Sequence, residues 1–381
     1  MDVRSAPQDY RVPMSAPDIA AEDIALVTQA LNSKILSLGP FLDELEKSFA
    51  AYIGTRHAIA ASNGTAGLHL CVRAAEIADG DEVITTPFSF VASTNCILYE
   101  RAVPVFVDID ETSFNLDPAR VAGAVTARTR AVLPVHVFGQ PCEMNELQAV
   151  CAAHGLLLIE DACEAVGAEY RGRKVGTFGK AAVFSFYPNK QVTMGEGALI
   201  TTDDPHWASL MRSLRNQGRS AMGLGFSHEH LGYNYRLDEL SAALGLAQLR
   251  RIDDLLARRE RVAARYGELL SDMPGITLRR ILPSTTRPSS FVYVIQLHPG
   301  TDRSRVMAHL EERRIPSRIY FSPIHLQPYY RKRFGYREGD FPVTERVAAS
   351  ILALPFHANL LPDDMQYVAD ALRSAVVRAA A

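Results

Sequence analysis

A lysine placed just beyond a predicted core strand is the residue of this sequence with the most chemical potential. The apolar run from Ala181 to Phe186 predicts a short buried strand, and Pro188 ends it in a turn before Lys190. A lysine partly shielded from water is more readily neutral, and a neutral amine can form a Schiff base with an aldehyde. For a lysine considered alone, a place on a loop tip is the simpler interpretation. The residues around Lys190 must therefore decide between a reactive lysine and one on a loop tip.

An aspartate at the end of another predicted strand is the second candidate. Asp161 follows the apolar run 156–159, and the carboxyl ends of such strands form the ligand-binding edge of open α/β sheets. A carboxylate there can hold a protonated pyridine nitrogen, which makes the ring of pyridoxal phosphate an electron sink. The alternative role for a strand-ending aspartate is to cap a helix.

The stretch from Ser62 to Ala66 predicts an anion site between a strand and a helix. Gly64 allows close approach of the backbone, and the helix N-terminus offers free N–H groups to a phosphate. Ser185 could add a hydroxyl. Phe88 or Phe90 could cover a cofactor ring, although a place in the ordinary core is an equally good interpretation. The spacing of the histidines predicts no metal site.

These residues need a sheet that brings them together. Seven apolar runs, mostly separated by predicted helices, predict a largely parallel sheet covered on both faces. The expected strands are 57–61, 83–86, 103–107, 131–135, 156–159, 181–186 and 198–202. The expected helices of this part are 18–31, 40–52, 66–76, 93–100, 145–154 and 205–215. We expect Asp161 and Lys190 at one sheet edge, because no helix is predicted between their strands.

A long helical stretch, 237–272, leads into a second region of different pattern. There we expect strands 291–297 and 317–321, and helices 304–314, 344–352 and 362–378. The predicted domains are 1–257, an N-terminal segment with the large domain, and 258–381, a small C-terminal α+β domain. The loop 218–230 and the segment 318–325 are expected to shape the substrate pocket.

Composition restricts the function classes. The 381 residues are 48% hydrophobic and 22% charged with a net charge of −3, which favours a folded protein and argues against nucleic acid as a partner. Five scattered cysteines without a C-x-x-C pair are typical of a cytoplasmic protein with reduced thiols. The first residues, Met1 to Pro7, show no apolar signal segment, and no apolar run approaches the length that spans a membrane.

The ordered motifs resemble the DegT/DnrJ/EryC1/StrS family of pyridoxal-phosphate aminotransferases that act on nucleotide-linked keto sugars. The resemblance runs from about Pro13 to the C-terminus, and its motifs are 63–66, 86–94, 134–139, 160–165, 185–190, 195–197, 232–236, 323–328 and 354–355. Each motif alone is modestly specific, whereas the ordered set is highly specific. The resemblance implies the aspartate-aminotransferase fold (fold type I) and a homodimer with shared active sites.

The resemblance also implies roles for single residues. Lys190 would carry pyridoxal 5'-phosphate covalently and move the proton, and Asp161 would pair with the pyridine nitrogen. The phosphate would be held by Gly64, Thr65, Ala66 and Ser185, with Asn234 reaching in from the other chain. Phe90 would stack on the ring, and Tyr320 and His325 would contact the substrate. L-glutamate would be the amino donor, with pyridoxamine 5'-phosphate as the intermediate form of the cofactor. The amino acceptor would be a nucleotide-linked keto sugar, namely a 4-keto-6-deoxy sugar. The product would be used in cell-surface polysaccharide or antibiotic sugar synthesis.

Two positions depart from the commonest pattern of the family. Glu164 stands where glutamine or histidine is frequent near the phenolic oxygen of the cofactor, and a carboxylate there repels a phenolate unless it is protonated or turned away. Ala198 stands where a second glycine is usual after Gly197, which ordinary β angles tolerate.

Two other functions compete with transamination. A keto-sugar dehydratase of the same family resembles this sequence, but that branch carries histidine at the position of Lys190. A non-catalytic sensor that binds the cofactor or the sugar is the alternative from another class. The presence of both Lys190 and Asp161 argues against it, and a cofactor spectrum that responds to glutamate would separate enzyme from sensor.

Overall fold

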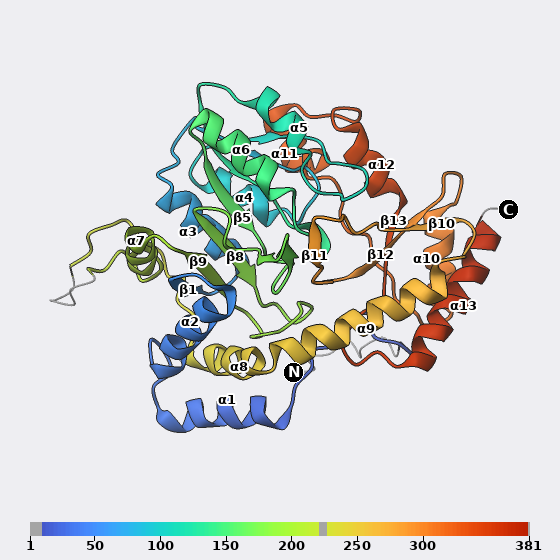
Figure 1. Cartoon of the computed structure of the whole chain (residues 1–381), viewed down its shortest axis with the longest axis horizontal. Coiled ribbons are helices and arrows are strands. Elements are labelled where there is room, and N and C mark those ends of the chain that lie inside the picture. The colour runs from blue at the N-terminus through green and yellow to red at the C-terminus, as the bar shows by residue number, and fades with distance from the viewer. Residues whose placement is uncertain (1–9, 221–226, 380–381) are drawn as a thin grey trace.

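A seven-stranded sheet forms the centre of the molecule in the computed structural model, which describes residues 10–220 and 227–379. Its order is β1-β9-β8-β5-β4-β2-β3, and Figure 1 shows it among the helices. The strands are β1 (His57–Ala61), β2 (Glu82–Thr85), β3 (Val103–Phe106), β4 (Thr129–Leu133), β5 (Leu157–Asp161), β8 (Ala181–Ser185) and β9 (Ala198–Thr202). All run in one direction except β9, which is antiparallel to both neighbours. The predicted seven-stranded, mainly parallel sheet is confirmed.

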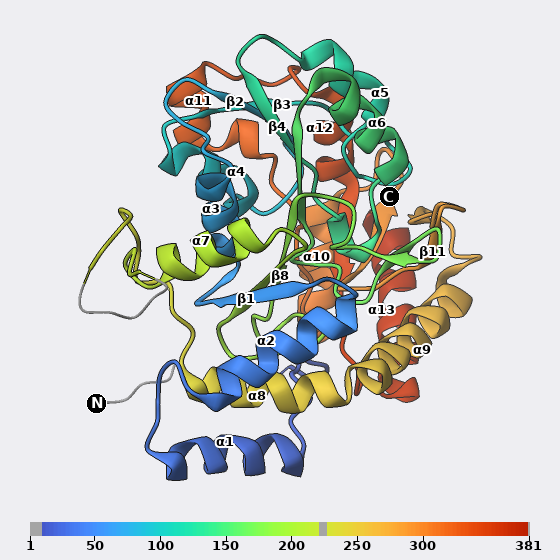
Figure 2. The same ribbon diagram turned by 60° about the vertical axis from the view of Figure 1, so that its left-hand side comes forward.

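Both faces of this sheet are covered, because successive strand residues point to opposite sides. In β8, Val183 packs into a core with Trp207, whereas Phe184 packs into a second core with Phe49. One face is covered by α3 (Gly64–Ala74), α4 (Ala92–Tyr99) and α7 (Pro205–Arg215). The opposite face is covered by α2 (Pro40–Ile53), α8 (Glu239–Arg250), α5 (Pro118–Val121) and α6 (Met144–His154), with α1 (Ala21–Ser33) packed outside α8. Figure 2 shows this arrangement from the side of α7 and α2.

The C-terminal region builds a smaller three-stranded antiparallel sheet with the order β10-β12-β13. Its elements are α9 (Ile252–Leu270), β10 (Ile276–Leu278), β12 (Tyr293–Leu297), α10 (Arg303–Glu312), α11 (Pro328–Phe334), α12 (Pro342–Ser350), β13 (Ile351–Leu354) and α13 (Pro362–Ala379). A third sheet joins β6 (Glu169–Tyr170), β7 (Arg173–Lys174) and β11 (Thr285–Arg287), so the two regions share a strand pairing. Short 3₁₀ turns lie at Ala122–Ala124, Val137–Gly139 and Ile324–Leu326. The predicted domain boundary at residue 258 falls inside α9 and stays a prediction.

Three predictions of elements are wrong. Residues 317–321 form no strand; only Arg318 makes an isolated bridge, to Ala353. The helix predicted over 344–352 ends at Ser350, because the next residues are buried and pair with β12 as β13. The long helix 237–272 is two helices with a break at Arg251, whose backbone leaves helical angles.

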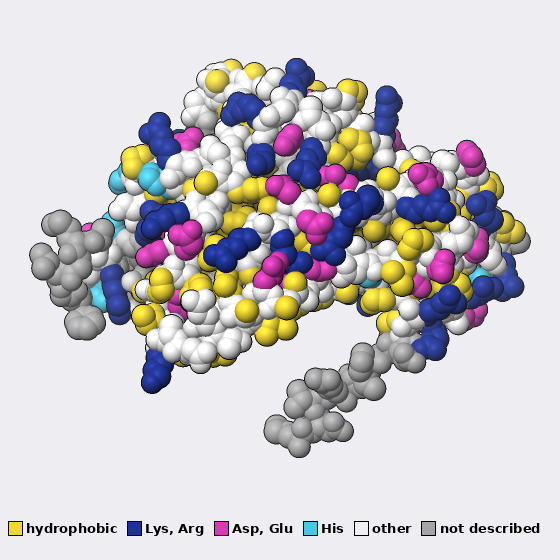
Figure 3. Space-filling view, turned by 60° about the horizontal axis from the view of Figure 1, so that its bottom comes forward, with side chains coloured by type: hydrophobic (Ala, Val, Ile, Leu, Met, Phe, Trp, Pro, Cys, Tyr) yellow, Lys and Arg dark blue, Asp and Glu magenta, His cyan; other side chains and the backbone are white. Residues whose placement is uncertain are grey.

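The described surface carries mixed charge on the face seen in Figure 3, where basic and acidic side chains are interspersed around apolar ones. Among the described residues, none of the helices combines the length and the apolar composition needed to cross a membrane. The prediction that Met1 to Pro7 contain no apolar signal segment concerns residues outside the described part of the chain.

Candidate active site

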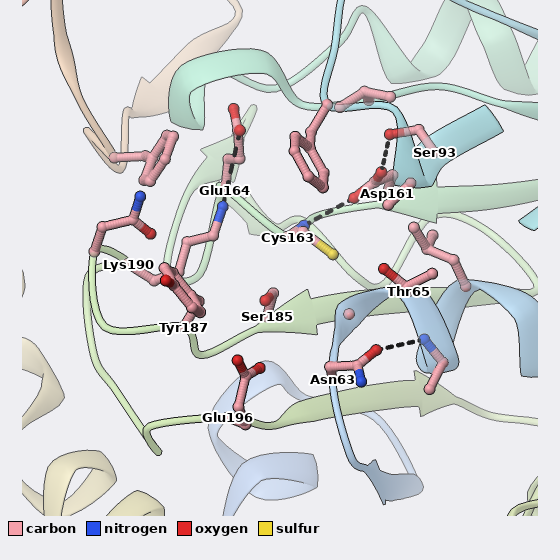
Figure 4. Close-up of a pocket in the computed structure, with 18 of the residues that line it drawn as sticks. Asn63, Thr65, Ser93, Asp161, Cys163, Glu164, Ser185, Tyr187, Lys190 and Glu196 are labelled. Carbon is pink, nitrogen blue, oxygen red and sulfur yellow. Dashed lines mark hydrogen bonds and ion pairs between the residues drawn. The ribbon is translucent and has the colours of Figure 1, made fainter. Parts of the chain in front are cut away.

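The site lies at the edge of the large sheet where the parallel strands end. Because β1, β5 and β8 run in the same direction, the residues that follow Ala61, the side chain of Asp161 and the side chain of Ser185 meet at one edge. A cavity of about 800 Å³ opens there, and Figure 4 shows its labelled residues pointing inward. It is lined by Asn63, Gly64, Thr65, Ala66, Leu68, Phe90, Ala92, Ser93, Tyr99, Val135, Asp161, Cys163, Glu164, Ser185, Tyr187, Asn189, Lys190, Glu196, Tyr235, Phe291, Tyr320 and Phe321.

Lys190 reaches into this cavity from the turn after β8. Its backbone N–H donates to Tyr187 at 2.9 Å, and the return of the chain is fixed by the bond from Met194 N–H to Phe186. The amine lies 3.8 Å from Glu164 Oε1 and 3.9 Å from the centre of the Phe291 ring, with the lysine side chain 12% exposed. The lysine is therefore held inside the cavity by an acid and an aromatic face, which excludes the loop-tip interpretation.

Asp161 is a buried carboxylate without a cationic partner among the described side chains. Its Oδ2 accepts a 2.6 Å hydrogen bond from Ser93, and its Oδ1 accepts one from Cys163 N–H at 3.1 Å. No helix begins after β5, so capping a helix is not its role. A buried carboxylate supported only by neutral donors is a good acceptor for a protonated ligand nitrogen.

The N-terminus of α3 forms the anion-binding end of the cavity. The helix begins at Gly64, two residues earlier than predicted, and Asn63 caps it by accepting the Ala66 N–H at 2.9 Å. Ala66 therefore lines the cavity without offering a free N–H. The remaining donors are the backbone of Gly64 and Thr65 and the hydroxyls of Thr65 and Ser185. A Cβ atom added to Gly64 would lie 3.1 Å from Ser185 Cβ, a tight contact that would press on the serine.

Glu164 faces the lysine rather than solvent. Its Oε2 accepts the Phe138 N–H at 2.9 Å, in the loop that Arg279 holds by donating to the Val137 carbonyl. Burial raises the pKa of Glu164, and this effect outweighs the lowering caused by the Lys190 ammonium and the Phe138 N–H. The carboxyl group is thus more easily protonated than usual, which is one of the two conditions that permit it near a phenolic oxygen.

The aromatic residues predicted for the site divide into two groups. Phe90 lines the cavity with 62% of its surface exposed, whereas Phe88 is fully buried in the core. Tyr320 also lines the cavity. Burial raises its pKa, against a lowering by its hydrogen bond with Asn189. Phe90 is therefore the one of the two phenylalanines that can cover a ring.

Two predicted site residues do not line this cavity. His325 is fully buried, and its Nε2 lies 3.0 Å from Glu345, so its prediction as a substrate contact is wrong for this structure. The neighbouring Ile324 N–H donates to Pro87 at 2.8 Å, so the motif supports the loop that carries Phe90. Asn234 is exposed and lies outside the cavity of its own chain, and the next helix, α8, is capped by Asp238 rather than by Asn234.

The sequence reasoning missed several side chains that the cavity contains. Ser93, Cys163, Tyr187 and Tyr235 lay inside motifs already quoted, and Phe321 lay in the segment 318–325, so their position next to a predicted site residue was the available signal. Phe291 comes from a segment far away in the chain, which no local pattern connects. Within residues 10–220 and 227–379, no group of three or more His, Cys, Asp or Glu side chains could hold a metal ion. The centre of the loop 218–230, predicted to shape the pocket, lies outside the described residues.

Comparison with known proteins gives one consistent result. The profile of the DegT/DnrJ/EryC1/StrS aminotransferase family matches residues 17–373. The spore coat polysaccharide biosynthesis protein SpsC of Bacillus subtilis is 40% identical over 97% of this chain and 98% of its own. GDP-perosamine synthase of Caulobacter vibrioides is 40% identical over 96% of this chain and 99% of its own.

Solved structures agree with this fold. DesV from S. venezuelae superposes with a TM-score of 0.88 and 38% identity over 93% of this chain and 94% of its own. The sugar aminotransferase Spr1654 from Streptococcus pneumoniae, described as putative and solved in a PLP form, reaches a TM-score of 0.91 at 25% identity, covering 97% of this chain and all of its own.

Proposed function

The chain belongs to the DegT/DnrJ/EryC1/StrS aminotransferase family, and from that premise we propose that it transfers an amino group from L-glutamate to a nucleotide-linked keto sugar with pyridoxal phosphate as cofactor. The observation that carries the proposal is the placement of the Lys190 amine and the buried Asp161 carboxylate in one cavity with an anion-binding helix end. Lys190 argues against the dehydratase branch, which by the family resemblance carries histidine at that position.

The residues present fit the cofactor. Asp161 would face the ring nitrogen, because it is a buried acceptor that lacks a cation among the described residues. The backbone of Gly64 and Thr65 and the hydroxyl of Ser185 would hold the phosphate, and Lys190 would carry the aldehyde carbon. When bound, the cofactor supplies an electron sink that lets a proton leave the carbon bearing the amino group.

The protein's own part is to place acids and bases around that carbon. The Lys190 amine would take this proton and return it, because it lies inside the cavity. Ser93 fixes the Asp161 carboxylate through a 2.6 Å hydrogen bond, so the negative charge keeps one position throughout. Phe291 and Tyr320 wall the cavity beside Lys190, which reduces access of water to the amine.

The acceptor is inferred from the relatives. One relative is named for a GDP-linked product and another for polysaccharide synthesis, and each aligns with this chain over nearly its whole length. We take a nucleotide-linked 4-keto-6-deoxy sugar as the acceptor, used for cell-surface polysaccharide or antibiotic sugar synthesis in the cytoplasm.

We further infer a homodimer with shared sites. Ser37 pairs with Asp238, so the exposed apolar side chains of Leu36 and Leu38 lie near the segment that carries Asn234. Leu231, three residues before Asn234, is 80% exposed. Covering these residues with a second chain would bury apolar area and bring each Asn234 toward the other cavity.

The cofactor test is covalent trapping. Purified protein is reduced with borohydride in the presence of pyridoxal phosphate, digested and searched for a phosphopyridoxyl group, which we expect on Lys190. An adduct on another lysine, or bound cofactor without any adduct, contradicts the assignment. A cofactor spectrum that does not respond to glutamate would instead identify a sensor. A panel of nucleotide-linked 3-keto and 4-keto sugars then defines the acceptor.

The shared-site test uses mixed dimers of Lys190→Ala and Asn234→Ala chains. If Asn234 serves the partner, one site in each mixed dimer keeps both native residues and activity returns. If it serves its own chain, both sites stay damaged. The test uses an Asn234→Ala homodimer shown to be folded and impaired.

A further inference from the structure

A buried polar cluster beside the cavity has no part in the functions described above. His69 of α3 is 3% exposed, with its Nδ1 3.1 Å from the Tyr235 hydroxyl and its Nε2 2.8 Å from Glu100 Oε1. The Tyr233 hydroxyl donates to the same Glu100 oxygen at 3.1 Å. Arg73 approaches the other oxygen of Glu100 at 3.4 Å. Burial of polar groups is costly unless they are hydrogen-bonded, and here the imidazole, the carboxylate and the two hydroxyls bond one another.

The hydrogen-bond directions in the cluster follow from its acceptors. The carboxylate of Glu100 can only accept, so the hydrogen atom between it and His69 is assigned to Nε2. The Nδ1 atom of a neutral His69 then accepts from the Tyr235 hydroxyl. Both tyrosine hydroxyls therefore donate toward the interior, and both anchor the same five-residue segment, Gly232–Arg236.

That segment has an extended shape in which alternate side chains face opposite ways. The rings of Tyr233 and Tyr235 stack with centres 4.9 Å apart and planes 10° apart, both against His69. Their backbone N–H groups donate to Leu214 and Arg215, at 2.6 and 2.9 Å. Asn234, between them, is exposed, and within the part of the chain that the structure describes its amide makes no side-chain hydrogen bond.

We propose that His69 and Glu100 position Asn234 for the cofactor site of the partner subunit. The pair holds the side chains of Tyr233 and Tyr235 toward the protein interior. Because Asn234 lies between them in an extended segment, its side chain then points to the surface. The proposal rests on the proposed function, because it needs a dimer whose sites are shared. His69 and Glu100 are positioning residues in this role; neither needs to touch the cofactor.

Three possible effects of the cluster differ in the chain whose cofactor site they change. The Tyr235 side chain also lines the cavity of its own chain, so a local effect of the cluster would appear in that chain. A positioning effect on Asn234 would appear in the other chain. A general loss of stability would affect both chains equally.

Chain-resolved cofactor loading separates these effects. Mixed dimers of a His69→Leu chain and a wild-type chain, each carrying a different affinity tag, are purified through both tags in turn and titrated with pyridoxal phosphate. Borohydride then fixes the cofactor, and intact mass gives the loaded fraction of each chain. We expect the wild-type chain, whose partner is altered, to need about tenfold more cofactor for half-loading, the effect of losing one hydrogen bond to a charged group. The His69→Leu chain should load like wild type.

Further variants make the result specific. His69→Gln, which retains one donor and one acceptor, should restore most of the affinity. Should His69→Leu fail to fold, the double variant Tyr233→Phe/Tyr235→Phe keeps both rings and removes only the hydroxyls, with the same expected result. The matched control is His309→Leu, a buried histidine 3.6 Å from Glu312 on α10, which should leave both chains loading equally.

Two results would overturn the positioning role. One is weaker loading of the altered chain itself, and the other is equal loading of both chains. Wild-type protein that takes no cofactor, or that stays monomeric, contradicts the proposed function instead, so the wild-type dimer is measured first.

Discussion

At the scale of single residues, Asp161 and Glu164 show how two buried carboxyl groups in one cavity acquire different tasks. Asp161 accepts two hydrogen bonds from neutral donors and lies at the end of a strand, so its position is rigid. Glu164 faces the Lys190 amine at 3.8 Å, and burial raises its pKa. The first is suited to accept from a ligand nitrogen at a fixed position, and the second is more easily protonated than an ordinary glutamate.

Asp161→Asn should lower turnover on the order of 10²-fold, since it keeps the shape but removes a preorganised charge. The rate of the glutamate half-reaction, followed by cofactor absorbance, measures the effect. Ser93→Ala removes one hydrogen bond while the charge remains and should have a much smaller effect. An Asp161→Asn enzyme with nearly normal turnover would refute the role.

Glu164→Gln should change the pH dependence of stability. A carboxyl group with a raised pKa in the folded state stabilises the fold below its unfolded pKa, and this advantage is lost as pH rises through the folded value. The free energy of unfolding of the wild type should therefore fall relative to that of Glu164→Gln as pH rises. Above the folded pKa, the loss should be about 1.4 kcal/mol for each unit by which the folded pKa exceeds the unfolded pKa. Urea unfolding of cofactor-free protein between pH 4 and 8 measures the difference. A difference that does not change with pH, or that grows in favour of wild type as pH rises, is incompatible with this environment.

At the scale of elements, α2 depends on a side chain from α8. The residue at the N-cap of α2 is Gly39, which has no side chain to accept a capping hydrogen bond. The side chain of Glu239 accepts these bonds instead. The fully buried carboxylate accepts N–H groups from Gly39, Phe41 and Leu42 at 2.9 to 3.1 Å. A Cβ atom on Gly39 would come within 2.8 Å of the Glu239 carboxylate, so glycine makes the approach possible.

Glu239→Gln should lower the free energy of unfolding by about 1–3 kcal/mol, because three N–H groups at a helix N-terminus lose an anionic acceptor. Thermal and urea unfolding measure the loss. Glu268→Gln, at an exposed position of α9 where the glutamate pairs with Arg265, serves as the control and should change stability by less than about 0.5 kcal/mol. Equal effects of the two changes would show that the cap contributes nothing specific.

The elements that the sequence predicts well are those whose signal is local. β1 and β9 were predicted with their observed bounds, because each is an apolar run between clear turns, and α7 because Pro205 follows a capping aspartate. The first two residues of β13 were assigned to a helix, because the pairing of this strand with β12 is decided by residues more than fifty positions away. The strands β6 and β7 were missed because two residues are too few to show a periodic pattern.

The candidate site divides in the same way. Lys190, Asp161, Thr65 and Ser185 were predictable because the ends of parallel strands meet at one edge. The contact of His69 with Glu100 and with Tyr235 was not, because it joins a helix interior to segments 31 and 166 positions away. His325 was predicted from its motif, but the structure shows that the motif supports a loop.

At the scale of the whole molecule, Asp18 joins three separate parts of the chain. Its carboxylate accepts hydrogen bonds from Arg251, at the break between α8 and α9, from Arg258 at 2.9 Å and from Asn359 at 2.7 Å. Burial alone would raise the pKa of Asp18, but these donors lower it to about 2. The N-terminal segment is thereby fastened across the junction of the two regions.

Asp18→Asn should remove part of the acid sensitivity of the protein. A carboxylate with a lowered pKa contributes stability that is present above its unfolded pKa and lost as pH falls through its folded value, here between about pH 4 and 2. We expect the variant to be about 2 kcal/mol less stable than wild type at pH 6, with the difference shrinking below pH 4. Urea titrations at several pH values measure this. Asp79→Asn, an exposed pair with Arg101, is the control. A difference between wild type and Asp18→Asn that persists unchanged at pH 3 would argue against the ion pairs as its source.

The antiparallel strand β9 has a consequence for folding of the chain during its synthesis on the ribosome. β1 lies at the edge of the sheet, and its neighbour there is β9, so His57 pairs with Thr202. At roughly 5–20 residues per second, β1 emerges on the order of ten seconds or more before its partner has been synthesised. During that interval an apolar strand presents unpaired backbone groups, with the helix that will carry the anion site directly behind it. Translation pauses between residues 62 and 198 are therefore where a nascent chain of this kind is most exposed to aggregation and most in need of a chaperone.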